Sequence, residues 1–97
     1  MNINIQHNQT KEEAKRRMEA LIQRLKKQYG GQIQNLKEEW SGYTNKIEGS
    51  AKGYSVSGTI DVKELIVDVD LKIPFLLQVF SKKIKSVVEE QIKKELA

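Results

Sequence analysis

The stretch Tyr54–Ile73, YSVSGTIDVKELIVDVDLKI, decides the fold of this chain. Apolar and polar residues alternate along it in two runs, with Lys63-Glu64 marking a turn between them. A period of two residues places the apolar side chains of a strand on one face of a sheet. The stretch therefore predicts an antiparallel hairpin with one buried and one solvated face. The apolar face is expected to hold Tyr54, Val56, Gly58, Ile60, Val62, Leu65, Val67, Val69, Leu71 and Ile73.

Residues 43–51 and the first seven residues alternate in the same way. The turn signal Lys52-Gly53 joins residues 43–51 to the hairpin, so this segment is expected to be the preceding strand of a meander. In the N-terminal segment, Ile3, Ile5 and His7 share the apolar face. Both segments are predicted to extend the sheet.

Residues 32–42 are ambiguous. Ile33, Leu36 and Trp40 have the spacing of a helix, but they also fit a strand with one irregular step. The strand is favoured because Gly30-Gly31 ends the preceding helix and Ser41-Gly42 marks a tight turn. We therefore predict a strand from Ile33 to Trp40.

The first helix is predicted over residues 11–29. Thr10 and Glu13 have capping-box spacing, in which the Thr hydroxyl accepts the Glu13 amide hydrogen and the Glu13 carboxylate returns to the Thr10 amide. Apolar residues then recur every three or four positions as far as Tyr29. Gly30-Gly31 is expected to end the helix in the left-handed conformation.

A second helix is predicted after Pro74, which closes the last strand and suits the first turn of a helix. The two helices need a common apolar face to pack on, because an amphipathic helix or a one-sided sheet is not stable alone. The sequence thus predicts an α+β fold in one domain, residues 1–97, with both helices on one face of an antiparallel sheet in the order β-α-β-β-β-β-α. The buried stripe of the second helix is expected to contain Leu77, Phe80, Ile84, Val87, Val88, Ile92 and Leu96.

Composition excludes several classes of chemistry. The 97 residues contain no Cys, so there is no disulfide framework, thiolate metal site or cysteine nucleophile. No run of about 18 apolar residues and no signal-peptide pattern occurs, and a soluble cytoplasmic protein without a transmembrane segment is therefore expected. One small domain matches this length.

Catalytic and metal-binding patterns are weak. His7 is the only imidazole, and a single imidazole without thiolates makes a poor metal site. Asp61, Asp68 and Asp70 fall on the face predicted to be solvated, where acidic residues are ordinary. No phosphate-binding loop or nucleophile motif is present. We therefore expect no enzyme activity, no metal and no cofactor.

The start of the second helix is the most unusual segment. Phe75, Leu76 and Val79 fall partly off the buried stripe and need burial under the first helix, a partner chain or a hydrophobic surface. Lysines follow directly. We predict a contact surface for a partner made of Phe75, Leu76, Val79, Phe80, Lys82 and Lys83.

Positive charge is concentrated on the first helix. The net charge is +4, and residues 11–29 carry seven basic against three acidic groups. Such a helix can bind phosphates. Nucleic acid is nevertheless unlikely as a partner, because Tyr43 and Tyr54 are expected to face the core rather than offer a stacking surface. The predicted basic face consists of Lys15, Arg16, Arg17 and Arg24.

Several short motifs along the chain resemble one family. They are Ala14-Lys15-Arg16, Tyr29-Gly30, Val56–Val62, and Ile73-Pro74-Phe75-Leu76-Leu77 continuing through Phe80, Lys83 and Ile84. Their order and spacing resemble the polyhydroxyalkanoic acid system protein family nearly end to end. Only Gln32–Lys52 departs, being longer and more polar than the family pattern.

The resemblance implies a small bacterial protein associated with polyhydroxyalkanoate storage granules. It suggests a non-enzymatic granule-associated or regulatory protein, located in the cytoplasm at granules, with the granule surface or granule proteins as partners. The alternative is a small homodimeric ligand- or protein-binding module without granule contact. A third interpretation is nucleic-acid binding by the basic first helix.

Overall fold

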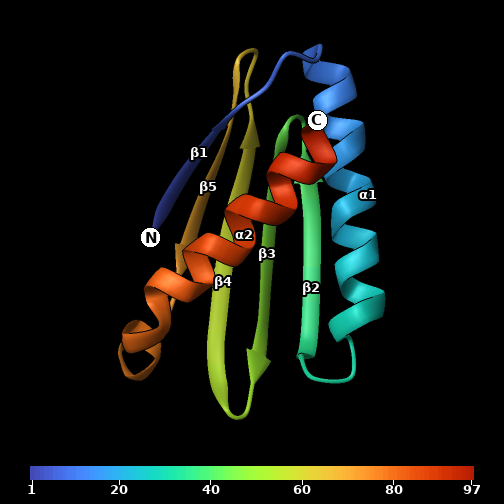
Figure 1. Cartoon of the computed structure of the whole chain (residues 1–97). Coiled ribbons are helices and arrows are strands. Elements are labelled where there is room, and N and C mark those ends of the chain that lie inside the picture. Colours follow the sequence, from blue (N-terminus) through green and yellow to red (C-terminus); the bar gives the residue numbers. More distant parts are fainter.

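The computed structural model describes residues 1–97 and contains one five-stranded antiparallel sheet with two α-helices (Figure 1). The order β-α-β-β-β-β-α is confirmed, with a short 3-10 helix, η1, inserted before the second α-helix. Neighbouring strands follow the order β1-β5-β4-β3-β2, so the N-terminal strand pairs with the last one. The elements are β1 (Asn2–Gln6), α1 (Lys11–Tyr29), β2 (Gln34–Ser41), β3 (Thr44–Ala51), β4 (Tyr54–Val62), β5 (Ile66–Lys72), η1 (Phe75–Phe80) and α2 (Ser81–Leu96).

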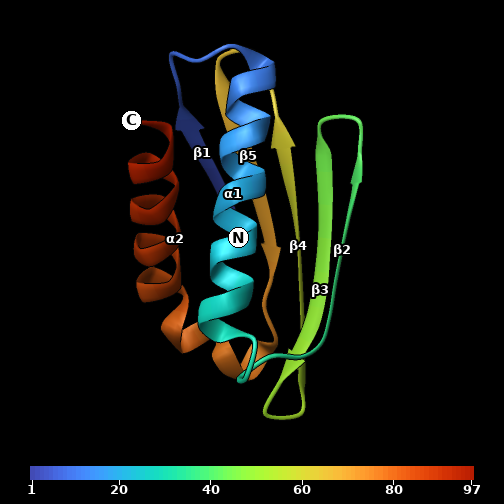
Figure 2. The same cartoon turned by 90° about the vertical axis from the view of Figure 1, so that its right-hand side faces the viewer.

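The strand register brings the apolar residues of the quoted hairpin into one row. Val69 of β5 lies between Ile3 of β1 and Ile60 of β4, and Val67 lies between Ile5 and Val62. Side chains of a strand alternate between faces, so this register directs the whole row toward the helices. Both helices cover this face of the sheet (Figure 2). The buried core consists of Ile3, Ile5, Ala14, Met18, Leu21, Ile22, Val62, Val67, Val69, Ile92 and Leu96.

The ambiguous segment is a strand, as predicted, with one irregular step. The pairing of β2 with β3 shifts register between Gln34 and Lys37, and Asn35 has a φ of 55°. The left-handed conformation expected at Gly30-Gly31 is wrong, because Gly30 has a φ of −59°. The chain instead leaves α1 through further turns, and the left-handed conformation occurs at Asn35, within β2. Asn is a residue type that tolerates this conformation.

Helix α1 begins where the cap spacing predicts. The Thr10 hydroxyl accepts a hydrogen bond from the Glu13 amide over 3.1 Å. The return bond from the Glu13 carboxylate to the Thr10 amide is not formed, which corrects the expected capping box. That carboxylate binds Arg16 and Arg17 instead, because two guanidinium groups one turn further along the helix are stronger donors than one amide.

The apolar stripe predicted for the second helix is wrong at its start. Phe80 and Val87 are 54% and 46% exposed, and only Leu77 of η1 is half-buried. Residues 75–80 form a 3-10 helix with about three residues per turn. A stripe with a period of 3.6 residues therefore does not continue from η1 into α2.

Leu65 also departs from its expected place on the buried face. Its side chain is 74% exposed, because Leu65 lies in the turn between β4 and β5 rather than within a strand. Strand β5 begins at Ile66, and its first buried side chain is Val67.

Candidate functional site

Four large apolar side chains of η1 are exposed to solvent. Phe75, Leu76, Val79 and Phe80 have exposed fractions of 85%, 64%, 80% and 54%. We call these four residues the η1 patch. Single exposed apolar residues are common on proteins, but four within six residues form a candidate interaction surface. Of the three alternatives for Phe75, Leu76 and Val79, burial under the first helix is wrong, because all three side chains are exposed.

Local hydrogen bonds hold η1 in shape. The Leu77 amide donates to the Pro74 carbonyl over 2.8 Å, and the Gln78 side-chain amide donates to the Ile73 carbonyl over 3.1 Å. Pro74 itself starts the turn with a φ of −54°. The segment lies beyond the end of β5, at the lower left of Figure 1.

Lys82 and Lys83 follow the η1 patch in the first turn of α2. Both are exposed, and neither forms an ion pair, whereas Lys85 pairs with Glu89 over 3.9 Å. This end of α2 has no side-chain cap and no acidic residue in its first turn. The structure thus places all six residues of the predicted contact surface at one end of the molecule.

The predicted basic face of α1 has partners within the chain. Arg16 and Arg17 bind the Glu13 carboxylate, and Arg24 Nη1 lies 2.8 Å from Glu95 Oε2 on α2. Lys15 Nζ lies 5.2 Å from the centre of the Trp40 ring. These contacts fix part of the charge in place, and the role of the face toward a partner stays a prediction.

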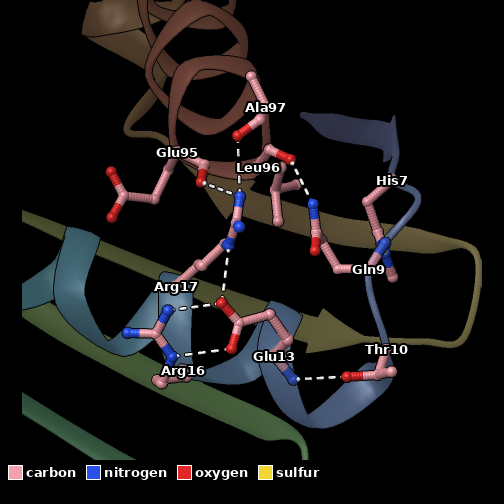
Figure 3. Close-up of polar contacts among 9 residues, drawn as sticks. All are labelled: His7, Gln9, Thr10, Glu13, Arg16, Arg17, Glu95, Leu96 and Ala97. Carbon is pink, nitrogen blue, oxygen red and sulfur yellow. Dashed lines mark hydrogen bonds and ion pairs between the residues drawn. The ribbon is translucent and has the colours of Figure 1, made fainter.

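Arg17 caps the C-terminal end of α2 (Figure 3). Its Nη1 donates to the carbonyl oxygens of Glu95 and Ala97 over 3.3 and 2.9 Å. Gln9 Nε2 donates to the Leu96 carbonyl over 3.2 Å. The last carbonyls of a helix have no partners within it and carry partial negative charge. Arg17 and Gln9 therefore fasten this end of α2 to α1 and to the loop before it.

Two carboxylates of α1 have lowered pKa values. Hydrogen bonds from Arg16 and Arg17 lower the pKa of Glu13 to about 2. The pKa of Glu12 is lowered by a backbone hydrogen bond and by the hydroxyl of Tyr43, which lies 3.0 Å from Glu12 Oε1. The same contact raises the pKa of Tyr43. The bond between Glu12 and Tyr43 connects α1 to the turn before β3, and Glu13 holds Arg17, which contacts the end of α2.

His7 has a structural environment. It is buried directly after β1, with Nε2 2.9 Å from the Lys63 carbonyl oxygen and Nδ1 3.1 Å from the Gln9 amide nitrogen. Since the amide must donate to Nδ1, the proton of the neutral ring lies on Nε2 and points to Lys63. Both ring nitrogens are occupied by backbone groups.

Two of the three aspartates predicted on the solvated face, Asp61 and Asp68, have hydrogen-bond partners. Asp61 lies directly opposite Asp68, but Asp61 accepts from the Thr44 hydroxyl over 3.1 Å and Asp68 accepts from Asn2 Nδ2 over 2.9 Å. No group of three or more His, Cys, Asp or Glu residues is placed to hold a metal ion.

An apolar groove lies between α1, α2 and the sheet, and the sequence analysis did not predict it. Its volume is about 310 Å³, and thirteen of its seventeen lining residues are hydrophobic. The two helices meet near the C-terminal end of α2 and diverge toward its other end (Figure 1), and the groove lies between them. No local sequence signal marks this groove, because its lining comes from both helices and from four strands of the sheet.

A buried polar pair lies on the same face. Asn45 is fully buried opposite Trp40, and its Nδ2 donates to Glu38 Oε2 over 2.7 Å. Asn45 Oδ1 has no hydrogen-bond partner. Glu38 Oε1 lies 4.0 Å from Lys26 Nζ on α1, at the outer limit of an ion pair.

The family of polyhydroxyalkanoic acid system proteins (PHA_gran_rgn) has a model that matches residues 1–96. The chain belongs to this family. No curated protein and no solved structure matches it. The resemblance stated from short motifs is thus confirmed over nearly the full chain, including the segment Gln32–Lys52 that looked atypical.

Membership of the polyhydroxyalkanoic acid system family fixes the general context of the protein but no reaction. The family description names a system and no enzyme activity. No helix of the structure has both the length and the apolar character needed to cross a membrane. The contact surface and the groove are therefore the features of this family member that need a functional explanation.

Proposed function

We propose that this protein is a non-enzymatic, cytoplasmic component of polyhydroxyalkanoate granules that attaches to the polyester surface through the η1 patch. The carrying observation is the exposure of four large apolar side chains in one short 3-10 helix beside two unpaired lysines. Family membership supports an apolar polymer as the surface. We further propose that the protein regulates the granule through this attachment.

The amount of exposed surface supports a partner. The chain exposes 6693 Å², whereas a folded monomer of 11.2 kDa is expected to expose about 5,700 Å². Part of this excess belongs to η1 and to the open groove. Each apolar side chain of the patch that became fully buried on a granule would contribute about 1.5 to 3 kcal/mol.

The position of Lys82 and Lys83 supports the same surface. Cations in the first turn of a helix lie at the positive end of its macrodipole and lower its stability. Neither lysine recovers this cost through an ion pair within the chain. We infer that they contact anionic groups at the rim of the granule surface while the η1 patch enters the apolar layer.

Co-sedimentation with protein-free polyhydroxybutyrate granules tests the proposal. The wild type should pellet with the granules at low and high salt, and Leu76→Glu should stay in the supernatant. The matched control is Leu65→Glu, because Leu65 is as exposed as the patch residues but lies at the other end of β5. Far-UV circular dichroism must show that both variants are folded.

The outcomes separate the possible surfaces. Equal binding of Leu76→Glu and Leu65→Glu would show that attachment does not use η1. No binding by the wild type would exclude direct attachment to polyester. Wild-type binding that is lost at high salt, together with loss at low salt on Lys82→Gln with Lys83→Gln but not on Leu76→Glu, would reassign the site to electrostatic contact with anionic groups of the surface.

A second copy of the chain is the alternative occupant of the η1 patch. The same excess of exposed surface favours it, because homodimer interfaces are rich in apolar residues. Multi-angle light scattering distinguishes the two cases. A dimer that becomes a monomer on Leu76→Glu, without granule binding by the wild type, would favour the homodimeric module.

A further inference from the structure

We propose that the groove between α1 and α2 binds a single aliphatic chain that carries a carboxylate head. Nothing in the family description assigns a ligand to it. The inference does not depend on granule attachment, because the groove lining and the η1 patch share no residue.

The size and lining of the groove define the apolar part of the ligand. A volume of about 310 Å³ lies at the lower end of the range of small-molecule sites, about 300 to 1,000 Å³. This suits one aliphatic chain and is too small for a two-chain lipid. Leu25 of α1, Val88 of α2 and Ile47 of β3 represent its three walls. Such walls offer dispersion contacts and no hydrogen bonds, so the inserted part must be apolar.

The charge at the groove defines the head of the ligand. Lys26 is the only charged residue among those that line it, and its side chain is 36% exposed. Its ion pair with Glu38 is long, at 4.0 Å, and Glu38 already accepts a shorter hydrogen bond from Asn45. Residues 20–29 of α1 contain Arg24, Lys26 and Lys27 but no acidic residue. Arg24 is already paired with Glu95, so Lys26 and Lys27 supply the positive charge on this side of the groove, which complements an anion.

Two polar side chains at the groove complete the site. Tyr29 and Gln91 both line it, from α1 and α2, and Tyr29 is 40% exposed. A carboxylate beside Lys26 has two oxygens that accept hydrogen bonds from such hydroxyl and amide groups. An alcohol or an alkane lacks the charge that Lys26 recognises. The site as a whole thus matches an aliphatic carboxylate.

A titration of the ¹⁵N-labelled full chain with octanoate, decanoate and dodecanoate, each below its micelle concentration, tests the proposal. Amide shifts should concentrate on the residues that line the groove. Affinity should rise about tenfold for each two methylenes added, until the cavity is full. Decan-1-ol, which has the same chain without the charge, should bind at least tenfold more weakly than decanoate.

Two variants and their controls locate the site. Val88→Trp should fill the groove and abolish the shifts, whereas Val79→Trp in the η1 patch should leave them. Lys26→Gln should weaken decanoate binding about tenfold and leave decan-1-ol unchanged, whereas Lys27→Gln should have little effect. If Val88→Trp does not fold, the comparison of Lys26→Gln with Lys27→Gln still decides the question.

Several results would overturn the proposal. Shifts confined to η1 would assign binding to the exposed patch. Equal affinity for decanoate and decan-1-ol would remove the carboxylate from the proposal, and no shift with any chain length would remove the ligand. Wild-type protein that is dimeric, with its groove amides shifting on dilution to the monomer, would identify a second copy as the occupant. Co-sedimentation of Val88→Trp with granules tests the function proposed for η1 independently of the groove.

Discussion

The two ends of α2 differ in how they are held. At the C-terminal end, Ile92 and Leu96 are buried, and Arg17 and Gln9 bind the last carbonyls of the helix. At the N-terminal end, the helix has no side-chain cap, and the η1 patch before it is exposed. The C-terminal end of α2 is thus part of the core, whereas the η1 patch before its N-terminal end is exposed to solvent.

This difference explains why the groove and the contact surface lie where they do. The apolar groove lies between two helices that meet near the C-terminal end of α2 and diverge toward its other end (Figure 1). Ile92 and Val69 line the groove and also belong to the buried core, whereas no residue of the η1 patch does. Stability and the predicted surface contact therefore depend on different residues of the C-terminal segment.

The largest expected effect is a loss of stability at the fastened end. Ile92→Ala should lower the free energy of unfolding by about 3 kcal/mol, because it removes buried methyl groups and leaves a cavity. Val79→Ala at the open end should change it by less than about 0.5 kcal/mol. Urea denaturation at neutral pH measures both. Similar losses for the two variants would contradict the proposed division of α2.

A smaller effect is expected for the cap on α2. Arg17→Met keeps the aliphatic stem but leaves the carbonyls of Glu95 and Ala97 without their donor, and should cost about 1 kcal/mol. The control is Arg16→Met, which also removes a guanidinium from Glu13 but none from α2. Amide hydrogen exchange should accelerate in the last turn of α2 for Arg17→Met alone. Equal exchange in both variants would show that the cap does not fasten the helix.

The smallest effect is the pH dependence of Glu13. Its pKa is lowered from 4.5 to about 2 in the folded chain, so the unfolded chain binds the proton more readily. The stabilisation is therefore complete above pH 4.5 and is lost as the pH falls from about 4.5 to 2. In Glu13→Gln the midpoint of urea denaturation should fall less steeply over this range than in the wild type. Parallel curves would show that Glu13 does not contribute.

Most of the fold could be predicted because its signals are local. The alternation in Tyr54–Ile73 and the helical spacing in residues 11–29 each follow from the geometry of a single element. The irregular strand β2 could also be predicted, because the spacing of Ile33, Leu36 and Trp40 fits a strand with one irregular step. Phe75, Leu76 and Val79 are exposed, as their poor fit to the stripe of the second helix suggested, and their role as contact residues stays a prediction.

Other features could not be predicted because they depend on distant segments or on small differences in helical twist. The six-residue 3-10 helix rotated Phe80 out of the expected stripe. The Glu13 carboxylate accepts hydrogen bonds from Arg16 and Arg17 instead of from the Thr10 amide. Arg17 also donates to carbonyl oxygens at the end of α2, almost eighty residues away in the chain. No local pattern contains such a contact.

The family, the order of the elements and the buried face of the strands could be predicted from the sequence, because periodicity and motif order are properties of the chain alone. Three features depend on how distant segments pack: α2 is fastened at one end, η1 remains exposed, and a groove of about 310 Å³ stays open between the helices. The physical reason is that the angle between two packed helices depends on where their side chains meet. Here Arg17, Arg24 and Glu95 set that meeting point.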